Sequence, residues 1–205
     1  MPSRREFLQA GLAASMLPRT IPESHSVPAA SETSAAMPGA HSIYKVISDI
    51  RFPQSVAFGL EAQRLGAQLV RISGDITDIW FNDLSVRWKE QPVAIAGLTA
   101  HGPVFCLERL AWDHGMRVVF RGEHRVLDHG RIEHSMSGPQ PTIARARSLA
   151  LDGPQWGTRV AHVVTACQAW HGVSESAIMT TPSNHGADEA VEPLVSWVIA
   201  PVSRS

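Results

Sequence analysis

Short apolar runs alternate with segments of helical periodicity over much of the sequence, and this alternation constrains the fold more than any other feature. The apolar runs are rich in β-branched side chains, and the segments between them carry apolar side chains at the spacing of one helix face. In chain order the alternating segments are 44–50, 55–65, 68–72, 93–98, 103–113 and 116–120. Such alternation predicts β-α-β units, in which strands run parallel and helices cover both faces of the sheet.

The pattern changes after residue 120, where two runs flank the turn Asp128-His129-Gly130. Residues 121–127 and 131–136 therefore predict a β-hairpin, because glycine supplies the positive φ of such a turn. The other predicted elements are a short helix or loop over 78–90, helices over 142–151 and 157–170, a long loop over 179–192 and a strand over 193–200. The predicted fold is a three-layer α/β domain with a mainly parallel, Rossmann-like sheet and an antiparallel hairpin extension.

Polar side chains follow each of the four predicted parallel strands. In an open α/β sheet the ligand crevice lies beyond the carboxyl ends of the strands, so the predicted fold indicates that candidate site residues lie there. The candidate catalytic acids at this rim are Asp49 and Asp75. The candidate ligand-binding residues are Thr99, Gly102, Arg121 and Glu123. The alternative is that Asp49, Asp75 and Thr99 cap helices or turns, as these residue types do at strand-to-helix junctions.

A cysteine and a histidine lie close together in sequence after the third predicted strand. Cys106 falls in the first turn of the predicted helix, where the positive end of a helix favours a thiolate, and His101 precedes that helix. Together they could form a Cys-His nucleophile of amidase or racemase type. The alternative is that Cys106, like Cys167, is a free thiol buried in an apolar helix, although an oxidising compartment would also permit one disulfide between them.

The hairpin brings two histidines together. A three-residue loop centred on His129 places His124 directly opposite His134 on one face of the hairpin. Imidazole pairs of this kind bind metals, and His101 or Asp75 could supply a third ligand. Scattered histidines also serve as ordinary hydrogen-bonding residues, so the metal site is one of two alternatives.

Two common cofactor motifs are missing from the sequence. The loop after the first strand reads DIRFPQS and lacks the Gly-x-Gly-x-x-Gly turn of dinucleotide-binding proteins, and no phosphate-binding P-loop occurs. The charge balance is also unremarkable, because eighteen Lys and Arg face nineteen Asp and Glu. A net charge near zero argues against nucleic acid as a partner.

The N-terminal residues Ser3-Arg4-Arg5-Glu6-Phe7-Leu8 and the short apolar stretch 10–17 resemble a twin-arginine signal peptide. The apolar stretch is shorter than the roughly 18 residues of a membrane span, so no stable membrane insertion is expected. The resemblance implies export of a folded protein by the twin-arginine translocase to the periplasm or beyond. Residues 1–36 would be signal and disordered linker, and 43–205 a single α/β domain, whose own family the sequence does not reveal.

Three functions remain open. The first is an accessory or partner subunit of a larger exported periplasmic enzyme, with a redox complex as the expected type, since the export route carries folded assemblies. Six tryptophans could anchor that interface: Trp80, Trp88, Trp112, Trp156, Trp170 and Trp197. The second is a stand-alone α/β enzyme of the Cys-His or His-metal type, with its site at the rim. The third is a small-molecule binding module using the same rim.

Overall fold

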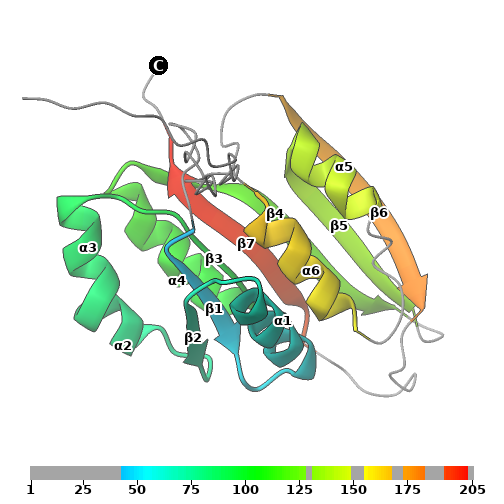
Figure 1. The fold of residues 1–205 in the computed structure, drawn as a ribbon, viewed down its shortest axis with the longest axis horizontal. Coiled ribbons are helices and arrows are strands. Elements are labelled where there is room, and N and C mark those ends of the chain that lie inside the picture. Colours follow the sequence, from blue (N-terminus) through cyan, green and yellow to red (C-terminus); the bar gives the residue numbers. More distant parts are fainter. Residues whose placement is uncertain (1–42, 128–130, 149–154, 168–172, 183–191, 203–205) are drawn as a thin grey trace, which may run out of the picture. The chain divides into compact units, whose positions relative to one another are not determined.

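The computed structural model describes residues 43–127, 131–148, 155–167, 173–182 and 192–202, all within the unit Met37–Ser205. Seven strands and seven helical segments follow one another there (Figure 1). In chain order they are β1 (Lys45–Asp49), α1 (Pro53–Arg64), β2 (Leu69–Ile72), α2 (Thr77–Ile79), the π-helical turn η1 (Trp80–Leu84), α3 (Ser85–Glu90), β3 (Ile95–Ala100), α4 (His101–Trp112), β4 (Met116–Leu127), β5 (Arg131–Pro139), α5 (Gln140–Ser148), α6 (Trp156–Thr165), β6 (Ser174–Pro182) and β7 (Leu194–Pro201).

One sheet contains all seven strands in the order β2-β1-β3-β7-β4-β5-β6. The α/β class with a parallel part and an antiparallel hairpin is confirmed, but the sheet is mixed where we predicted a mainly parallel one. Only the pairs β1–β2 and β1–β3 are parallel, and the other four neighbouring pairs are antiparallel. The reason is that β7 inserts between β3 and β4 and is antiparallel to both. Without β7, β4 could pair with β3 and extend the parallel part of the sheet.

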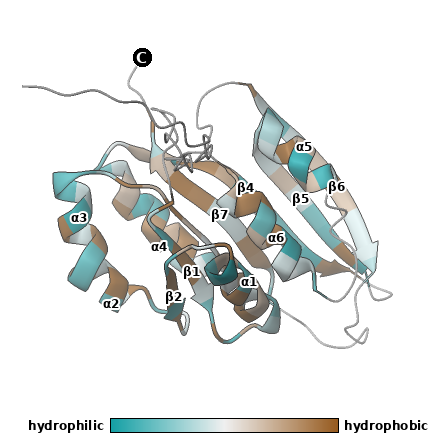
Figure 2. Ribbon diagram, in the orientation of Figure 1, coloured by the Kyte–Doolittle hydropathy of each residue, from teal (hydrophilic) through white to brown (hydrophobic). Residues whose placement is uncertain are grey.

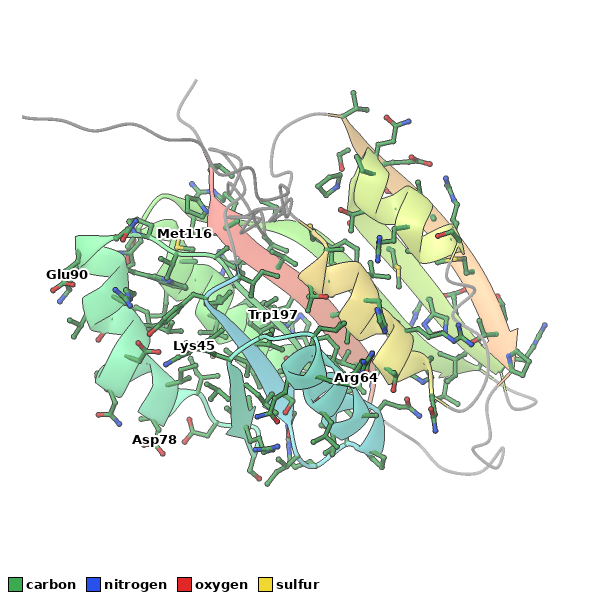
Figure 3. All side chains as sticks on the ribbon, viewed as in Figure 1. Lys45, Arg64, Asp78, Glu90, Met116 and Trp197 are labelled. Carbon is green, nitrogen blue, oxygen red and sulfur yellow. The ribbon has the colours of Figure 1, made fainter. Side chains whose placement is uncertain are left out.

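Two apolar cores lie on opposite faces of the sheet and make the fold three-layered. The first is formed with α1, α5 and α6, and the second with α2, η1, α3 and α4 (Figure 1). Strand β7 serves both cores, because Val198 and Ala200 belong to the first whereas Val195, Trp197 and Ile199 belong to the second. Trp197 accordingly lies at the middle of the sheet in Figure 3, while the charged Asp78 and Glu90 lie on the covering helices α2 and α3. A strand buried on both faces explains the largely apolar run, interrupted only by Ser196, that predicted it.

Strand β4 is a single strand of 12 residues where we predicted two elements. Its pairing with β7 shifts register between Val118 and Phe120, which marks a β-bulge. Met116 packs in the second core and Phe120 in the first, so the bulge turns the following residues toward α6. The hairpin thus continues the central sheet directly.

Strand β6 corrects the predicted loop over 179–192, because Met179–Pro182 form its last residues. It lies at the edge of the sheet, and only Ala177 and Thr181 of its nine residues are buried. Figure 2 shows the contrast, with β7 largely brown and β6 mostly pale or teal. The sequence of β6 therefore lacks the apolar signal by which the other strands were found.

Several sequence predictions fall outside the described residues: the signal and linker over 1–36, the hairpin tip 128–130 and the ends of two predicted helices at 149–151 and 168–170. Within the described ranges, no helix is long and apolar enough to cross a membrane.

Candidate functional site

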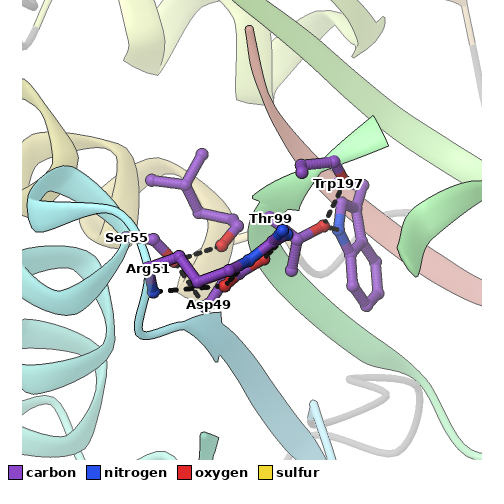
Figure 4. A network of polar contacts seen from close by, with 7 residues as sticks. Asp49, Arg51, Ser55, Thr99 and Trp197 are labelled. Carbon is purple, nitrogen blue, oxygen red and sulfur yellow. Dashed lines mark hydrogen bonds and ion pairs between the residues drawn. The ribbon is translucent and has the colours of Figure 1, made fainter. Parts of the chain in front are cut away.

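Asp49, the last residue of β1, is completely buried and forms a bidentate ion pair with Arg51 (Figure 4). Arg51 donates from Nε to Oδ1 at 2.9 Å and from Nη2 to Oδ2 at 2.6 Å, and hydrogen bonding with Asp49 raises the pKa of this guanidinium. Gly74 makes room for it, since a Cβ at Gly74 would lie 2.7 Å from Cζ of Arg51. The predicted catalytic acid thus has both carboxylate oxygens engaged.

Thr99 is buried at the end of β3 and serves the packing of Trp197 (Figure 4). Its hydroxyl donates to the carbonyl of Ala100 at 2.9 Å and accepts the indole N–H of Trp197 at 3.2 Å. Gly97 provides the space for that indole, because a Cβ there would lie 2.5 Å from Cζ2 of Trp197. The predicted ligand-binding threonine therefore has a structural partner on each side.

His124 and His134 face each other across β4 and β5, as the three-residue loop predicted. Their Nδ1 atoms lie 2.7 Å apart, His124 Nε2 lies 2.8 Å from Ser196 Oγ, and His134 Nε2 lies 2.9 Å from Thr181 Oγ1. The four residues belong to four adjacent strands, so a hydrogen-bonded chain crosses the sheet. Trp156 at the start of α6 packs against both imidazoles, with ring centroids 4.5 Å and 5.3 Å away.

Both imidazoles are neutral in this environment. Burial, with a contribution from His134, holds the pKa of His124 well below its ordinary value, and burial lowers the pKa of His134 to about 4. One tautomer assignment satisfies the chain: Thr181 donates to His134, His134 to His124, His124 to Ser196, and Ser196 to the carbonyl of Gly122 at 3.4 Å.

A metal at this pair would lack further ligands among the described residues, where no group of three or more His, Cys, Asp or Glu side chains comes together. The two Nδ1 atoms share one hydrogen bond, and both Nε2 atoms have hydroxyl partners. A cavity beside His124 and Trp156 measures about 40 Å³, the size of one or two water molecules. The two histidines therefore form a hydrogen-bonded polar contact within the core.

Arg121 and Glu123 do not lie at the rim, because β4 continues through Leu127 and places them in mid-strand. Their side chains alternate with the buried His124 and form a surface network. Arg121 Nη1 lies 3.6 Å from Glu108 Oε2, and Arg121 Nε lies 3.4 Å from Glu123 Oε1. The prediction assumed a strand end at residue 120, and the bulge explains why the apolar pattern changes there.

Helix α4 begins at His101, two residues earlier than predicted, and this separates the proposed Cys-His pair. Residues five positions apart on an α-helix point about 140° away from each other. His101 stacks instead on Phe105, with ring centroids 6.0 Å apart. Cys106 is exposed rather than buried, Cys167 is buried, and neither forms a disulfide. Gly102 lies in the first helical turn with open space around its Cβ position.

Asp75 and Cys106, predicted from different parts of the chain, do come together. Both line a surface groove of about 440 Å³ between the segment that leads into η1 and helix α4. The lining residues of this α4 groove are Asp75, Ile76, Thr77, Trp80, Phe81, Phe105, Cys106, Arg109 and Leu110. Asp75 also caps the start of α2, since its Oδ1 accepts the backbone N–H of Thr77 at 2.8 Å and its hydroxyl at 2.6 Å. These hydrogen bonds lower the pKa of Asp75.

Two phenylalanines of the groove are far more exposed than large apolar side chains usually are. Phe81 is 68% exposed and Phe105 is 45% exposed. Most tryptophans expected as surface anchors behave differently, because Trp88, Trp156 and Trp197 are buried. Trp80 is half-buried in the groove wall, and among the described tryptophans only Trp112, at 43%, is exposed. Trp170 lies outside the described residues. Sequence reasoning missed Phe105 and Arg109, whose only signal is an outward position on α4.

Comparison with known proteins returns no relative, because no protein-family model, curated protein or solved structure matches the chain.

Proposed function

We propose that this protein is an accessory or partner subunit of a larger exported periplasmic enzyme, with a redox complex as the expected type, and that it contacts its partner through the α4 groove. The observation that carries the proposal is the pair of exposed phenylalanines, Phe81 and Phe105, in one concave surface. Exposed aromatic side chains that meet in a groove are typical of binding surfaces, since each costs solubility unless a partner covers it.

The state of the chemistry-bearing residues supports binding over catalysis. Asp49 is held by Arg51, and His124 is held by His134 and Ser196. His101 and Cys106 diverge on one helix, so the predicted histidine base does not stand beside the thiol. The resemblance of the residues around Arg4 and Arg5 to a twin-arginine signal supports export to the periplasm, by a translocase that accepts folded proteins and their partners.

Site-specific photocrosslinking tests the proposal. A photoreactive phenylalanine analogue at position 105 should crosslink one protein in the periplasm of the native host, and the same analogue at position 178 should not. Ile178 is the matched control, because it is 70% exposed but lies on the edge strand β6. Loss of the adduct in Phe81→Ser would support docking in the groove. Equal crosslinking from both positions, or none from position 105, would refute it.

A small-molecule binding module is the second candidate, favoured by the groove's size. Ligand pockets in proteins commonly measure about 300–1,000 Å³ and combine apolar walls with a few polar groups. The α4 groove, at about 440 Å³ with Asp75 and Arg109 in its wall, falls in that range. Mass spectrometry of the protein purified from its native host under non-denaturing conditions would reveal such a ligand as a fixed mass increment.

A further inference from the structure

We infer that the occupant of the α4 groove is a segment of the partner protein in which an apolar side chain is followed closely by a carboxylate. The inference rests on the proposed function and specifies the chemistry of the partner. It is carried by three features of the groove wall: the exposed phenylalanines, the arginine beside them and the position of the acid.

Arg109 presents a guanidinium that is oriented by aromatic rings and has no acidic partner in the described part of the chain. Its Cζ lies 5.1 Å from the ring centroid of Phe105 and 4.1 Å from that of Trp112, so the planar group is stacked on aromatic faces. No carboxylate lies within ion-pair distance of Arg109 among the described residues. Arg51, Arg121 and Arg125, by contrast, each have at least one. A stacked guanidinium keeps its edge N–H groups available for bidentate binding of a carboxylate.

The phenylalanines determine which kind of side chain lies next to that carboxylate in the bound segment. Phe105 is both the stacking surface for Arg109 and a wall of the groove, so a group bound at the guanidinium brings its neighbour against Phe105 and Phe81. Burying these exposed rings favours an apolar or aromatic neighbour. Ile76 and Leu110 make the groove apolar at further points of its wall.

Asp75 fixes the polarity of the occupant. Its hydrogen bonds from Thr77 keep it ionised, so the occupant's carboxylate is repelled from Asp75 and attracted to Arg109. Asp75 can instead accept a backbone N–H of a bound segment. A partner segment suits this surface because Trp112, exposed and stacked on Arg109, extends the aromatic surface beyond the groove.

Cys106 provides a reporter for the test, because its exposed thiol lines the groove while Cys167 is buried. The rate of Cys106 alkylation by iodoacetamide would be measured on the purified protein with N-acetyl-phenylalanine, its uncharged amide, or N-acetylglycine at equal concentrations. We expect the acid to slow alkylation at least threefold more than the amide, with N-acetylglycine having little effect.

Variants assign the effect to the groove wall. Arg109→Gln should abolish the difference between acid and amide, Arg109→Lys should retain part of it, and Asp75→Asn should increase protection by the acid. Arg131→Gln is the matched control, because Arg131 is exposed on β5 and does not line the groove. Equal protection by acid and amide, or an unchanged difference in Arg109→Gln, would overturn the inference.

The two proposals fail separately. If position 105 crosslinks a partner but the acid gives no added protection, the inference is wrong and the proposed function stands. If the acid protects but position 105 crosslinks no protein, the site takes a small-molecule carboxylate, which overturns both the partner segment and the proposed function. An acidic apolar peptide taken from the crosslinked partner should protect Cys106 better than N-acetyl-phenylalanine if both hold.

Discussion

The imidazoles of His124 and His134 share a single hydrogen bond between their Nδ1 atoms, and this contact tolerates only one proton. Protonating either ring would direct two N–H groups at each other and place a charge in the core beside Trp156. The interior of the domain is therefore sensitive to acid at one identifiable point.

The free energy of unfolding should fall as the pH is lowered through the range from about 6.5 to about 4. The pKa of His134 is about 4 in the folded protein and near 6.5 in the unfolded chain, so the unfolded chain binds more protons between these values. The expected slope is about 1.4 kcal/mol per pH unit for each histidine. Urea unfolding followed by tryptophan fluorescence measures it. His101→Gln, on the surface, should leave the slope unchanged, and a pH-independent stability below 6.5 would contradict the prediction.

The two cysteines should differ sharply in reactivity. Burial raises the pKa of Cys167 to about 11, and its sulfur accepts a hydrogen bond from Thr142 at 3.4 Å, whereas Cys106 is exposed. A chromogenic disulfide reagent at pH 8 should react with one thiol of the native protein and with two in denaturant. Cys106→Ser should remove the native reaction and Cys167→Ser should retain it. Fast reaction of both native thiols would refute the burial of Cys167.

Helices α1 and α6 pack side by side on one face of the sheet and begin at the same end (Figure 1). Gly157 permits their close approach, because a Cβ there would lie 2.1 Å from the carbonyl oxygen of Gln54. Its backbone N–H also donates to Gln54 Oε1 at 3.0 Å, and His162 pairs with Glu61 at 2.8 Å further along the helices. These contacts set the distance between α1 and α6, the two helices that cover the first core here.

Gly157→Ala should destabilise the protein by about 1–3 kcal/mol, the usual cost of forcing atoms into a well-packed contact. The obstructing atom belongs to the backbone and cannot move without shifting α1. Gly102→Ala is the control of opposite sign, since its Cβ position is open and alanine favours a helix by about 0.5–1 kcal/mol. Thermal unfolding of the two variants beside the parent measures both effects, and equal unfolding temperatures would contradict this account of the interface.

Elements with a strong apolar pattern could be predicted from the sequence, and their pairing only in part. The facing of His124 and His134 followed from the loop length alone, since register in a hairpin is a local property. The insertion of β7 between β3 and β4 is a long-range choice that no local pattern records. Phe81 and Phe105 line one groove for the same reason. Of the groove's lining only Asp75 and Cys106, as catalytic candidates, and Trp80, as an interface anchor, were predicted.

At the scale of the whole molecule, the N-terminal resemblance and the α4 groove are consistent with one sequence of events, in which folding precedes export. The protein would fold, expose an aromatic groove and leave the cytoplasm by a route that accepts folded proteins. A protein exported alone would carry Phe81 and Phe105 uncovered, whereas one exported with its partner would keep them covered.

Replacing Arg4 and Arg5 together with lysine should block export. The proposed signal depends on the guanidinium pair, whose planar donors lysine does not reproduce. Fractionation of cells followed by immunoblotting should find the parent shortened in the periplasm and the double variant at full length in the cytoplasm. Arg19→Lys, outside the paired motif, is the control. Equal amounts of parent and double variant in the periplasm would rule out the twin-arginine route.

The central position of β7 also has a consequence for synthesis. β7 follows the six other strands in chain order, yet it supplies Trp197 and Val198 to the two cores at once. Until it emerges from the ribosome, β3 and β4 have no strand between them and neither core can close. The sheet can therefore close only once β7 has been synthesised, long after residues 3–8 have emerged from the ribosome.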